Sequence, residues 1–441
     1  MKKRIFLLTL MLTTALLFTG CAMRTVEEMY ALPKRSEEFN EMQSAIDTAM
    51  YGMTYASPQS GENQQTVQMA DLNGDGTDEI LVFAKGASEK PLQVLIFTQD
   101  ENGRVRTMET IGSNGLAFEQ VEYVDFDDQP GSELVVGIRV GDQVQRSVSV
   151  YTFRNGDAQL MLMNGYSKFV TCDLDQNGRA ELMVLRPGEQ EIQGGTAVLY
   201  HSGDSQIERS AEMSLSESPQ NIRRIMQGKL ENGSPAIFVA SAVGRDSVVT
   251  DILTVKEGQL INLAFSADVD TSVQTLRNYY VYAEDIDEDG VVELPSVITM
   301  KPISTWSQEE EKNLLRWYSF DDNTWEYDKL FTFHNYAGGW YIQLDGGWAS
   351  RITVEQLGGK FDFYLWDESY QSATPLFSLY VFTGSARDEE AVKDGRFALH
   401  RAEGIAYAAS LAEAAAEYAI TEDYLIDSFR LIRQDWQSGE T

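Results

Sequence analysis

One short acidic motif recurs along the chain, and its spacing limits the folds that the chain can adopt. The motif begins at Asp71, Asp125, Asp173 and Asp285. These starts are separated by 54, 48 and 112 residues, and the last interval is twice 56. A degenerate copy is therefore expected near residue 229, where GKLENGSPAIFVA keeps a turn glycine and an apolar run. Its acidic positions are predicted to have become Gly228, Leu230, Asn232 and Ala236.

Every unit predicts the same order of strands. A short strand enters the loop and a strongly apolar strand leaves it, as residues 66–70 and 80–83 do in the first unit. Two further strands follow, which makes four strands in about fifty residues, the pattern of a β-propeller blade. The predicted fold is therefore mainly β, a β-propeller of about five blades or more with an acidic loop in each intact repeat, over residues 56–335.

The fifth unit departs from this pattern. Pro295 interrupts the strand that leaves its loop, so this strand is expected to be bulged or to pair on one side only. Residues 313–333 are predicted to form the last hairpin of the fifth blade, with its turn at residues 321–323.

Helical and mixed segments are predicted on both sides of the repeats. Residues 36–50 have the spacing of an amphipathic helix, with Ser36 as the N-cap and Phe39, Met42, Ile46 and Met50 on one face. Residues 336–441 are predicted to form a small C-terminal α+β domain. Within it, the alanine-rich residues 404–420 are expected to be helical. Thr421 is expected to cap a last helix, which places Leu425, Phe429, Ile432 and Trp436 on one face.

The repeated loop has the donor pattern of a metal site. Counted from the first aspartate, positions 1, 3, 5 and 9 carry oxygen-bearing side chains. The candidate ligands are Asp71, Asn73, Asp75 and Glu79; Asp125, Asp127, Gln129 and Glu133; Asp173, Asp175, Asn177 and Glu181; and Asp285, Asp287, Asp289 and Glu293. Calcium prefers six to eight hard oxygen ligands, so Ca²⁺ is the predicted structural cofactor. The alternative is a solvated turn, because Asp, Asn and Gly favour turns without any metal.

Two positions distinguish this loop from related ones. Glycine at position 6 permits a sharp turn in three copies, whereas Pro130 replaces it in the second, which is predicted to be the weakest site. An EF-hand needs a carboxylate at position 12, where this chain has Val82, Val136, Val184 and Ser296. The acid at position 9 is present in all four copies instead.

This combination resembles the FG-GAP/VCBS repeat family, whose β-propellers carry calcium loops as in integrin-type head domains. The resemblance covers roughly residues 60–335, although the family more often has Asp at position 9 where this chain has Glu. It implies a propeller in which calcium ties together two strands of a blade. The repeats followed by a C-terminal domain also look like repeat-containing lipoproteins of bacterial envelopes.

The N-terminus predicts an export signal. Residues 1–21 read MKKRIFLLTLMLTTALLFTGC, with three basic residues before an apolar stretch that is short for a membrane span. The end of this stretch resembles a bacterial lipobox, although Phe18 stands where an aliphatic residue is usual. Residues 1–20 are thus a predicted lipoprotein signal peptide, Cys21 the lipidated residue, and residues 21–55 a tether and helix. The implied location is the extracytoplasmic face of a bacterial cell membrane. A cleaved signal peptide without lipid, or a short anchor helix, is the alternative.

Charge and cysteine content limit the possible partners. The formal net charge is −33, which repels nucleic acid phosphates, so no nucleic acid partner is predicted. The chain has only two cysteines. Lipidation of Cys21 would leave Cys172 without a disulfide partner, so large cores or bound metal are expected to supply stability.

No catalytic residue is predicted. The sequence contains no Gly-x-Ser-x-Gly, His-Glu-x-x-His or phosphate loop, and its three histidines have no motif around them. A scaffold that holds a protein or glycan ligand is therefore favoured. The alternative is an envelope-associated polysaccharide-active enzyme, since two carboxylates can come from anywhere in a fold. Trp340, Tyr341 and Trp348 lie beside glycines and are the candidate ligand-binding residues, unless they fill a core.

Overall fold

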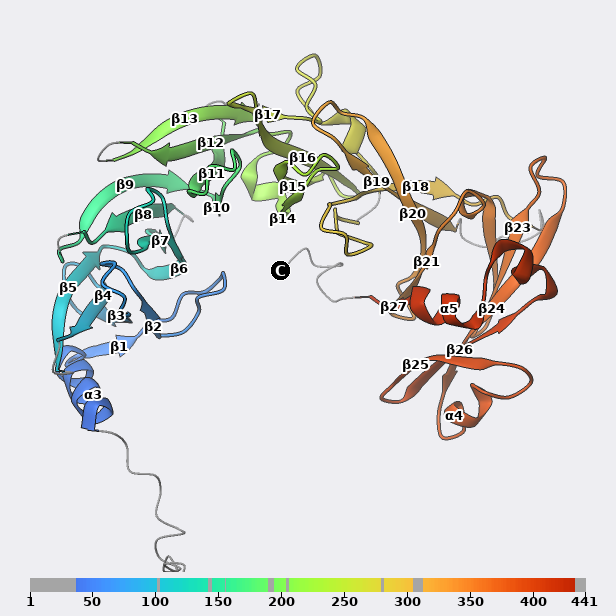
Figure 1. Ribbon diagram of the computed structural model, residues 1–441, viewed down its shortest axis with the longest axis horizontal. Helices are drawn as coiled ribbons and strands as arrows, with labels where there is room; N and C mark the ends of the chain where they lie inside the picture. The colour runs from blue at the N-terminus through green and yellow to red at the C-terminus, as the bar shows by residue number, and fades with distance from the viewer. Residues whose placement is uncertain are drawn as a thin grey trace, which may run out of the picture.

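The computed structural model describes residues 37–100, 104–141, 145–154, 156–188, 194–203, 206–278, 281–303 and 312–432. The predicted signal peptide, Cys21, Ser36 and Trp436 lie outside these residues. Within this part of the chain, no helix has the length and apolar character needed to cross a membrane. The strands form six antiparallel sheets, and the sheets follow one another in chain order around an open arc (Figure 1). The fold is mainly β, as predicted.

The first four sheets correspond to the first four sequence repeats. The first contains β1 (Met53–Tyr55), β2 (Val67–Ala70), β3 (Glu79–Gly86), β4 (Leu92–Gln99) and β5 (Val105–Ser113), and the second β6 (Ala117–Val124), β7 (Glu133–Arg139), β8 (Arg146–Thr152) and β9 (Gln159–Tyr166). The third contains β10 (Lys168–Cys172), β11 (Glu181–Pro187), β12 (Gly195–Ser202) and β13 (Ile207–Ser214), and the fourth β14 (Ile222–Lys229), β15 (Pro235–Val243), β16 (Ser247–Lys256) and β17 (Gln259–Asn262). In each sheet the strand before the loop pairs with the strand after it, which confirms the predicted strand order.

The fifth sheet extends beyond the last repeat. It contains β18 (Leu294–Thr299), β19 (Asn313–Phe320), β20 (Glu326–Asn335), β21 (Trp340–Leu344) and β27 (Phe429–Leu431). β18 lies at the sheet edge and pairs only with β19, as Pro295 predicts. The predicted hairpin between β19 and β20 is also present. However, β21 pairs with β20, so the domain boundary expected between residues 335 and 336 falls inside one sheet.

The sixth sheet replaces most of the helical structure predicted at the C-terminus. It contains β22 (Ile352–Leu357), β23 (Lys360–Trp366), β24 (Ala373–Thr383), β25 (Phe397–Ala402) and β26 (Ile405–Leu411). The prediction of a helix over residues 404–420 is wrong for β26, which pairs with β24 on one side and β25 on the other. Pairing on both sides overrides the local helix preference of its buried alanines. The helical segments described near this sheet are short, namely α4 (Arg387–Glu390), α5 (Glu422–Ser428) and the 3₁₀ turns at Ala349–Arg351 and Glu413–Tyr418.

Two predicted helices are confirmed. α3 (Glu37–Ala49) packs Met42 and the buried Ile46 on the first sheet. α5 (Glu422–Ser428) begins where the hydroxyl oxygen of Thr421 accepts the backbone N–H of Tyr424 at 3.1 Å. α5 is shorter than expected, because Phe429 already belongs to β27.

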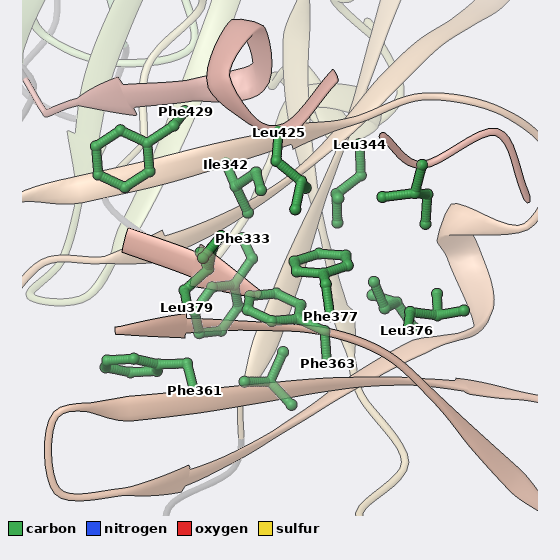
Figure 2. Close-up of a cluster of buried hydrophobic side chains, with 14 of the residues drawn as sticks. Phe333, Ile342, Leu344, Phe361, Phe363, Leu376, Phe377, Leu379, Leu425 and Phe429 are labelled. Atoms are coloured by element: carbon green, nitrogen blue, oxygen red, sulfur yellow. The ribbon is translucent and has the colours of Figure 1, made fainter. Parts of the chain in front are cut away.

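The hydrophobic cores lie between consecutive sheets. Figure 2 shows the core between the fifth and sixth sheets. The rings of Phe333 and Phe363 meet there edge to face, with their centroids 5.5 Å apart. Helices cover the outer faces at both ends of the arc: α3 packs on the first sheet, and Ala391 at the end of α4 packs on Ala406 and Ala408 of the sixth. Stacked units with covered ends are typical of a capped array.

Candidate metal centre

Each intact loop buries its position-9 glutamate beneath the loop backbone. The exposed fractions of Glu79, Glu133, Glu181 and Glu293 are 0%, 3%, 4% and 0%. In all four, Oε2 accepts the backbone N–H of loop position 2 at 2.8 to 3.0 Å. Position 2 is always a buried apolar residue, namely Leu72, Phe126, Leu174 or Ile286. This apolar residue anchors the loop in the core and holds its amide on the glutamate.

The aspartate at position 1 closes the loop from inside. Oδ1 of Asp71 accepts the N–H of Gly74 at 2.7 Å, and Oδ2 accepts the N–H of Gly76 at 2.9 Å. The corresponding bonds to the position-6 glycine are 3.1 Å in the third loop and 3.0 Å in the fifth. All three position-6 glycines have a φ of +85°, a conformation that glycine adopts without steric cost. This confirms the predicted role of glycine at position 6.

Three of the four loops bring three carboxylates together. Oxygen atoms lie within 4.8 Å of one another in Asp125, Asp127 and Glu133, in Asp173, Asp175 and Glu181, and in Asp285, Asp287 and Asp289. In the first loop, by contrast, Nδ2 of Asn73 donates to Glu79 at 2.8 Å and to Asp75 at 3.2 Å. Carboxylates this close repel one another unless a proton or a cation compensates.

Burial makes the position-9 glutamates weaker acids than an exposed glutamate. Removal from water raises the pKa of Glu79 and Glu133 above the usual range. The same cause raises the pKa of Glu181 to about 7 and that of Glu293 to about 8, with a further contribution from the neighbouring aspartates. A divalent cation favours the charged carboxylate and acts in the opposite direction.

The fifth loop has a buried oxygen that lacks a partner. Oε1 of Glu293 makes no hydrogen bond within the described part of the chain, although the residue is fully buried. In the first two sheets, hydroxyl groups of Thr98 and Thr152 bond the equivalent glutamate. Ser319 has this place in the fifth sheet, but it donates to Glu231 at 2.5 Å instead. An unpaired buried carboxylate oxygen is costly, and a hard divalent cation is the partner that this set of oxygen ligands fits.

The second loop contains a side-chain cation. Arg154, two residues after β8, forms an ion pair with Asp127. Pro130 takes position 6, and the left-handed residue becomes Gly131, with a φ of +96°. Asp125 still accepts a backbone N–H, that of Asp128, at 2.7 Å. The loop therefore forms without the position-6 glycine, and a guanidinium group compensates part of its charge.

The fourth loop is one residue shorter than predicted. Gly228 pairs with Ala236 across the sheet. In the other repeats, it is the residue just before the loop that pairs with position 9 in this way. Lys229 is therefore the first loop residue, and the buried Leu230 is the second. The assignment from the sequence, which began the loop at Gly228 and gave Leu230 a ligand position, is wrong by one residue. Gly228 is required for packing, since a Cβ there would lie 2.2 Å from Val292.

A lysine links the fourth and fifth loops. Nζ of Lys329, on β20, lies 3.0 Å from Glu231 and 3.0 Å from Asp289. Burial acts against ionisation of Asp289, but the lysine outweighs it and lowers the pKa of this aspartate. Asp285, Asp287 and Glu293 have no ion pair of this kind among the described side chains, so a bound ion would still meet an excess of negative charge.

The predicted ligand-binding aromatics belong to the core. Trp340 is 0% exposed and its ring packs on Phe361 and Phe429. Tyr341 is also buried, and the half-buried Trp348 packs against the same core. For Trp340 and Tyr341 the burial favours the alternative stated from the sequence, that these rings fill a core, because pairing of β21 with β20 and β27 turns this segment into a central strand.

Comparison with known proteins identifies no family. No family model matches the chain, and no curated protein matches it. Among solved structures, the chain is similar to the rhamnogalacturonan lyase YesW, at 12% identity and a TM-score of 0.30, over 73% of this chain and 71% of the other. It is similar to the same degree to a Bacillus licheniformis rhamnogalacturonan lyase, at 12% identity and a TM-score of 0.30, over 73% of this chain and 72% of the other. A likeness this low carries no argument about fold or activity.

Proposed function

We propose that this protein is a lipid-anchored scaffold of the bacterial cell envelope, with β-propeller-type sheets that bind structural calcium and hold a protein or glycan ligand. The observation that supports calcium most directly is the unpaired, fully buried Oε1 of Glu293 beneath an acidic loop. The repeated loop sequence and its resemblance to FG-GAP/VCBS repeats support the same ion. The signal-like N-terminus with Cys21 supports the anchor.

The chain's own residues define how calcium would act. In the third and fifth loops, carboxylate oxygens of the aspartates at positions 1 and 3 already lie within 4.8 Å of each other. The position-9 glutamate of each of these loops is buried. The ion would supply positive charge to these carboxylates. In the third loop, position 9 begins β11, which pairs with β10 before the loop, so charge compensation there stabilises two paired strands at once. In the fifth loop, position 9 forms an isolated bridge with Glu284, the residue before the loop. The role is therefore structural, and affinities of about 10⁻⁴ to 10⁻³ M are sufficient outside the cell.

Thermal unfolding of the full chain in detergent tests the calcium proposal. Calorimetry is run in EDTA, after addition of excess CaCl₂, and after addition of MgCl₂ at the same ionic strength. We expect calcium to raise the midpoint and magnesium to raise it less, because magnesium demands tighter octahedral geometry. An unchanged midpoint with calcium, at concentrations up to those typical of extracellular modules, contradicts the proposal.

The anchor is tested separately. Cells that express the full chain are labelled with a radioactive fatty acid and fractionated, beside cells that express Cys21→Ser. We expect label and membrane association in the unchanged chain and loss of both in the variant. Membrane association of Cys21→Ser without label would show that the segment before Cys21 anchors the chain as a helix.

The ligand is tested on the intact anchored protein. Binding to arrays of envelope and plant glycans, and cross-linking in the producing cells, are compared with calcium and with EDTA. We expect one reproducible ligand that is lost when calcium is removed. Turnover of a glycan, abolished by substitution of one pair of carboxylates, would instead support the polysaccharide-active alternative.

A further inference from the structure

A row of backbone hydrogen bonds joins neighbouring loops. The N–H of Ser132 in the second loop donates to the carbonyl of Asp71 in the first at 2.9 Å. The N–H of Ala180 in the third loop donates to the carbonyl of Asp125 in the second at 2.7 Å. Both bonds run from position 8 of one loop to position 1 of the loop before it.

These bonds connect candidate ligand residues directly. Each acceptor carbonyl belongs to the first aspartate of a loop, and each donor immediately precedes a buried position-9 glutamate, Glu133 or Glu181. The first and second loops also touch through their backbones, because a Cβ on Gly131 would lie 2.6 Å from the carbonyl oxygen of Leu72. A shift of Asp71 that accommodates an ion therefore displaces the backbone beside Glu133.

The row has a gap between the third and fourth loops. The residue before Ala236, equivalent to Ser132 and Ala180, is Pro235, which has no N–H to donate. Beyond the gap, the N–H of Val292 in the fifth loop donates to the carbonyl of Lys229 in the fourth at 3.0 Å. The backbone hydrogen bonds thus join the described loops in two groups, one of three loops and one of two. Between the groups, only the side-chain amide of Gln176 in the third loop is described as donating to a loop carbonyl, that of Gly233 in the fourth, at 3.3 Å.

We propose that the first three loops respond to calcium as one cooperative unit, in which Arg154 is the built-in cation of the second loop, while the fifth loop responds independently. The inference rests on the proposed calcium function. Since the second loop already has a cation on Asp127, it transmits the change between its neighbours without an ion of its own. Coupling of this kind requires two sites and a shared element whose arrangement both of them bias.

Site-resolved hydrogen exchange on the full chain tests the inference. Exchange of peptides that contain the first, third and fifth loops is followed while free calcium is raised. The midpoint of each loop is the calcium concentration at which its protection from exchange is half complete. The variant Asp173→Asn/Asp175→Asn removes the third site. We expect it to raise the midpoint of the first loop about fivefold or more, the lower range of measured coupling, and to leave the fifth unchanged. Asp285→Asn/Asp287→Asn is the matched control, and it should leave the first and third midpoints unchanged.

The alternatives give distinct results. An unchanged first-loop midpoint in Asp173→Asn/Asp175→Asn overturns the inference but leaves the proposed function, because calcium still protects the loops. Equal shifts in the first and fifth loops also overturn it, since they indicate general destabilisation. No protection by calcium in any loop contradicts the proposed function itself.

A second variant tests the hydrogen bonds themselves. Ala180→Pro copies the natural break at Pro235 and removes the N–H that reaches Asp125. In this background, removal of the third site should no longer shift the first-loop midpoint. A shift of the same size as before would show that the coupling uses another route. If Ala180→Pro fails to fold, the comparison of the third-site and fifth-site variants still decides the inference.

Discussion

The second and fifth loops share acids at positions 1, 3 and 9, yet they compensate this charge differently. In the second loop, Arg154 pairs with Asp127. In the fifth, Lys329 reaches only Asp289 at the loop surface, and Oε1 of Glu293 is left without a partner. The same pattern of loop acids can therefore be stabilised by a side chain of the chain itself or left dependent on an ion from solution.

This difference has a physical origin in neighbouring strands. Arg154 follows β8, the strand next to the one that leaves the second loop. The equivalent region of the fifth sheet has Ser319, whose hydroxyl is directed to Glu231 of the fourth loop. A covalently attached cation is always present at its site, whereas occupancy by a dissolved ion follows its concentration. The stability of the second loop is thus expected to be independent of the calcium concentration, whereas that of the fifth is expected to depend on it.

The largest expected effect is loss of the calcium response when the fifth site is removed. Calcium at 100 times its dissociation constant adds about 2.7 kcal/mol to the free energy of unfolding through one site. We expect the variant Asp285→Asn/Asp287→Asn to lose this contribution. Asp125→Asn/Asp127→Asn is the matched comparison and should be less stable both with and without calcium. The gain in its free energy of unfolding on addition of calcium should be retained. Denaturant unfolding with EDTA and with calcium measures both, and equal increments lost in the two variants would remove the distinction between the loops.

A smaller effect is expected from pH in the absence of calcium. The pKa of Glu293 is about 8 in the folded protein against 4.5 unfolded, so the folded state holds a proton that the unfolded state releases. Its contribution to stability is full below pH 4.5 and is lost as pH rises through 8. In EDTA, the midpoint of thermal unfolding should fall between pH 5 and 8, and calcium should reverse this trend.

The matched variant is Glu293→Gln, which cannot ionise. It should flatten the fall in EDTA and remove part of the calcium reversal. An identical pH profile in the variant and the unchanged chain would assign the trend to other groups. Glu133→Gln, in the loop with the built-in cation, should change the response to calcium less than Glu293→Gln does.

The smallest effect concerns Arg154. Its side chain is partly exposed, so Arg154→Gln should cost only about 0.5–1 kcal/mol, as partly solvated ion pairs do. The variant should also make the second loop sensitive to calcium, because its three carboxylates then lack a cation. Arg209→Gln, which removes a surface ion pair on β13, is the control. A second loop that stays insensitive to calcium in hydrogen exchange would show that Pro130 alone prevents ion binding.

Local patterns predicted much of the fold because neighbouring residues determine them. The interval between first aspartates located five of the six sheets, and a continuous apolar run located the strand after each loop. Pro295 predicted an edge strand because proline lacks a donor in any environment. The helix predicted over residues 404–420 failed because alanine's preference is local, whereas β26 is decided by strands on both sides.

The candidate site was predicted only in part. The sequence located the acids, but Arg154 is distant in the chain and no local motif identifies it. The sequence does contain a signal for the buried glutamate: Thr98 and Thr152 each lie 27 residues after the first aspartate of their loop, and both bond the glutamate. The apolar residue at position 2, present in every copy, is a second such signal.

By itself, the sequence determined the repeat, the turn geometry and the oxygen side chains of the loops, since these depend on residues a few positions apart. Only the tertiary structure decided which loops have a built-in cation, which glutamate oxygen lacks a partner, and which loops are joined in a row. Those properties depend on strands from different hairpins and on backbone N–H groups. Nearly every residue carries such an N–H group, so the letters of the sequence do not show where it donates.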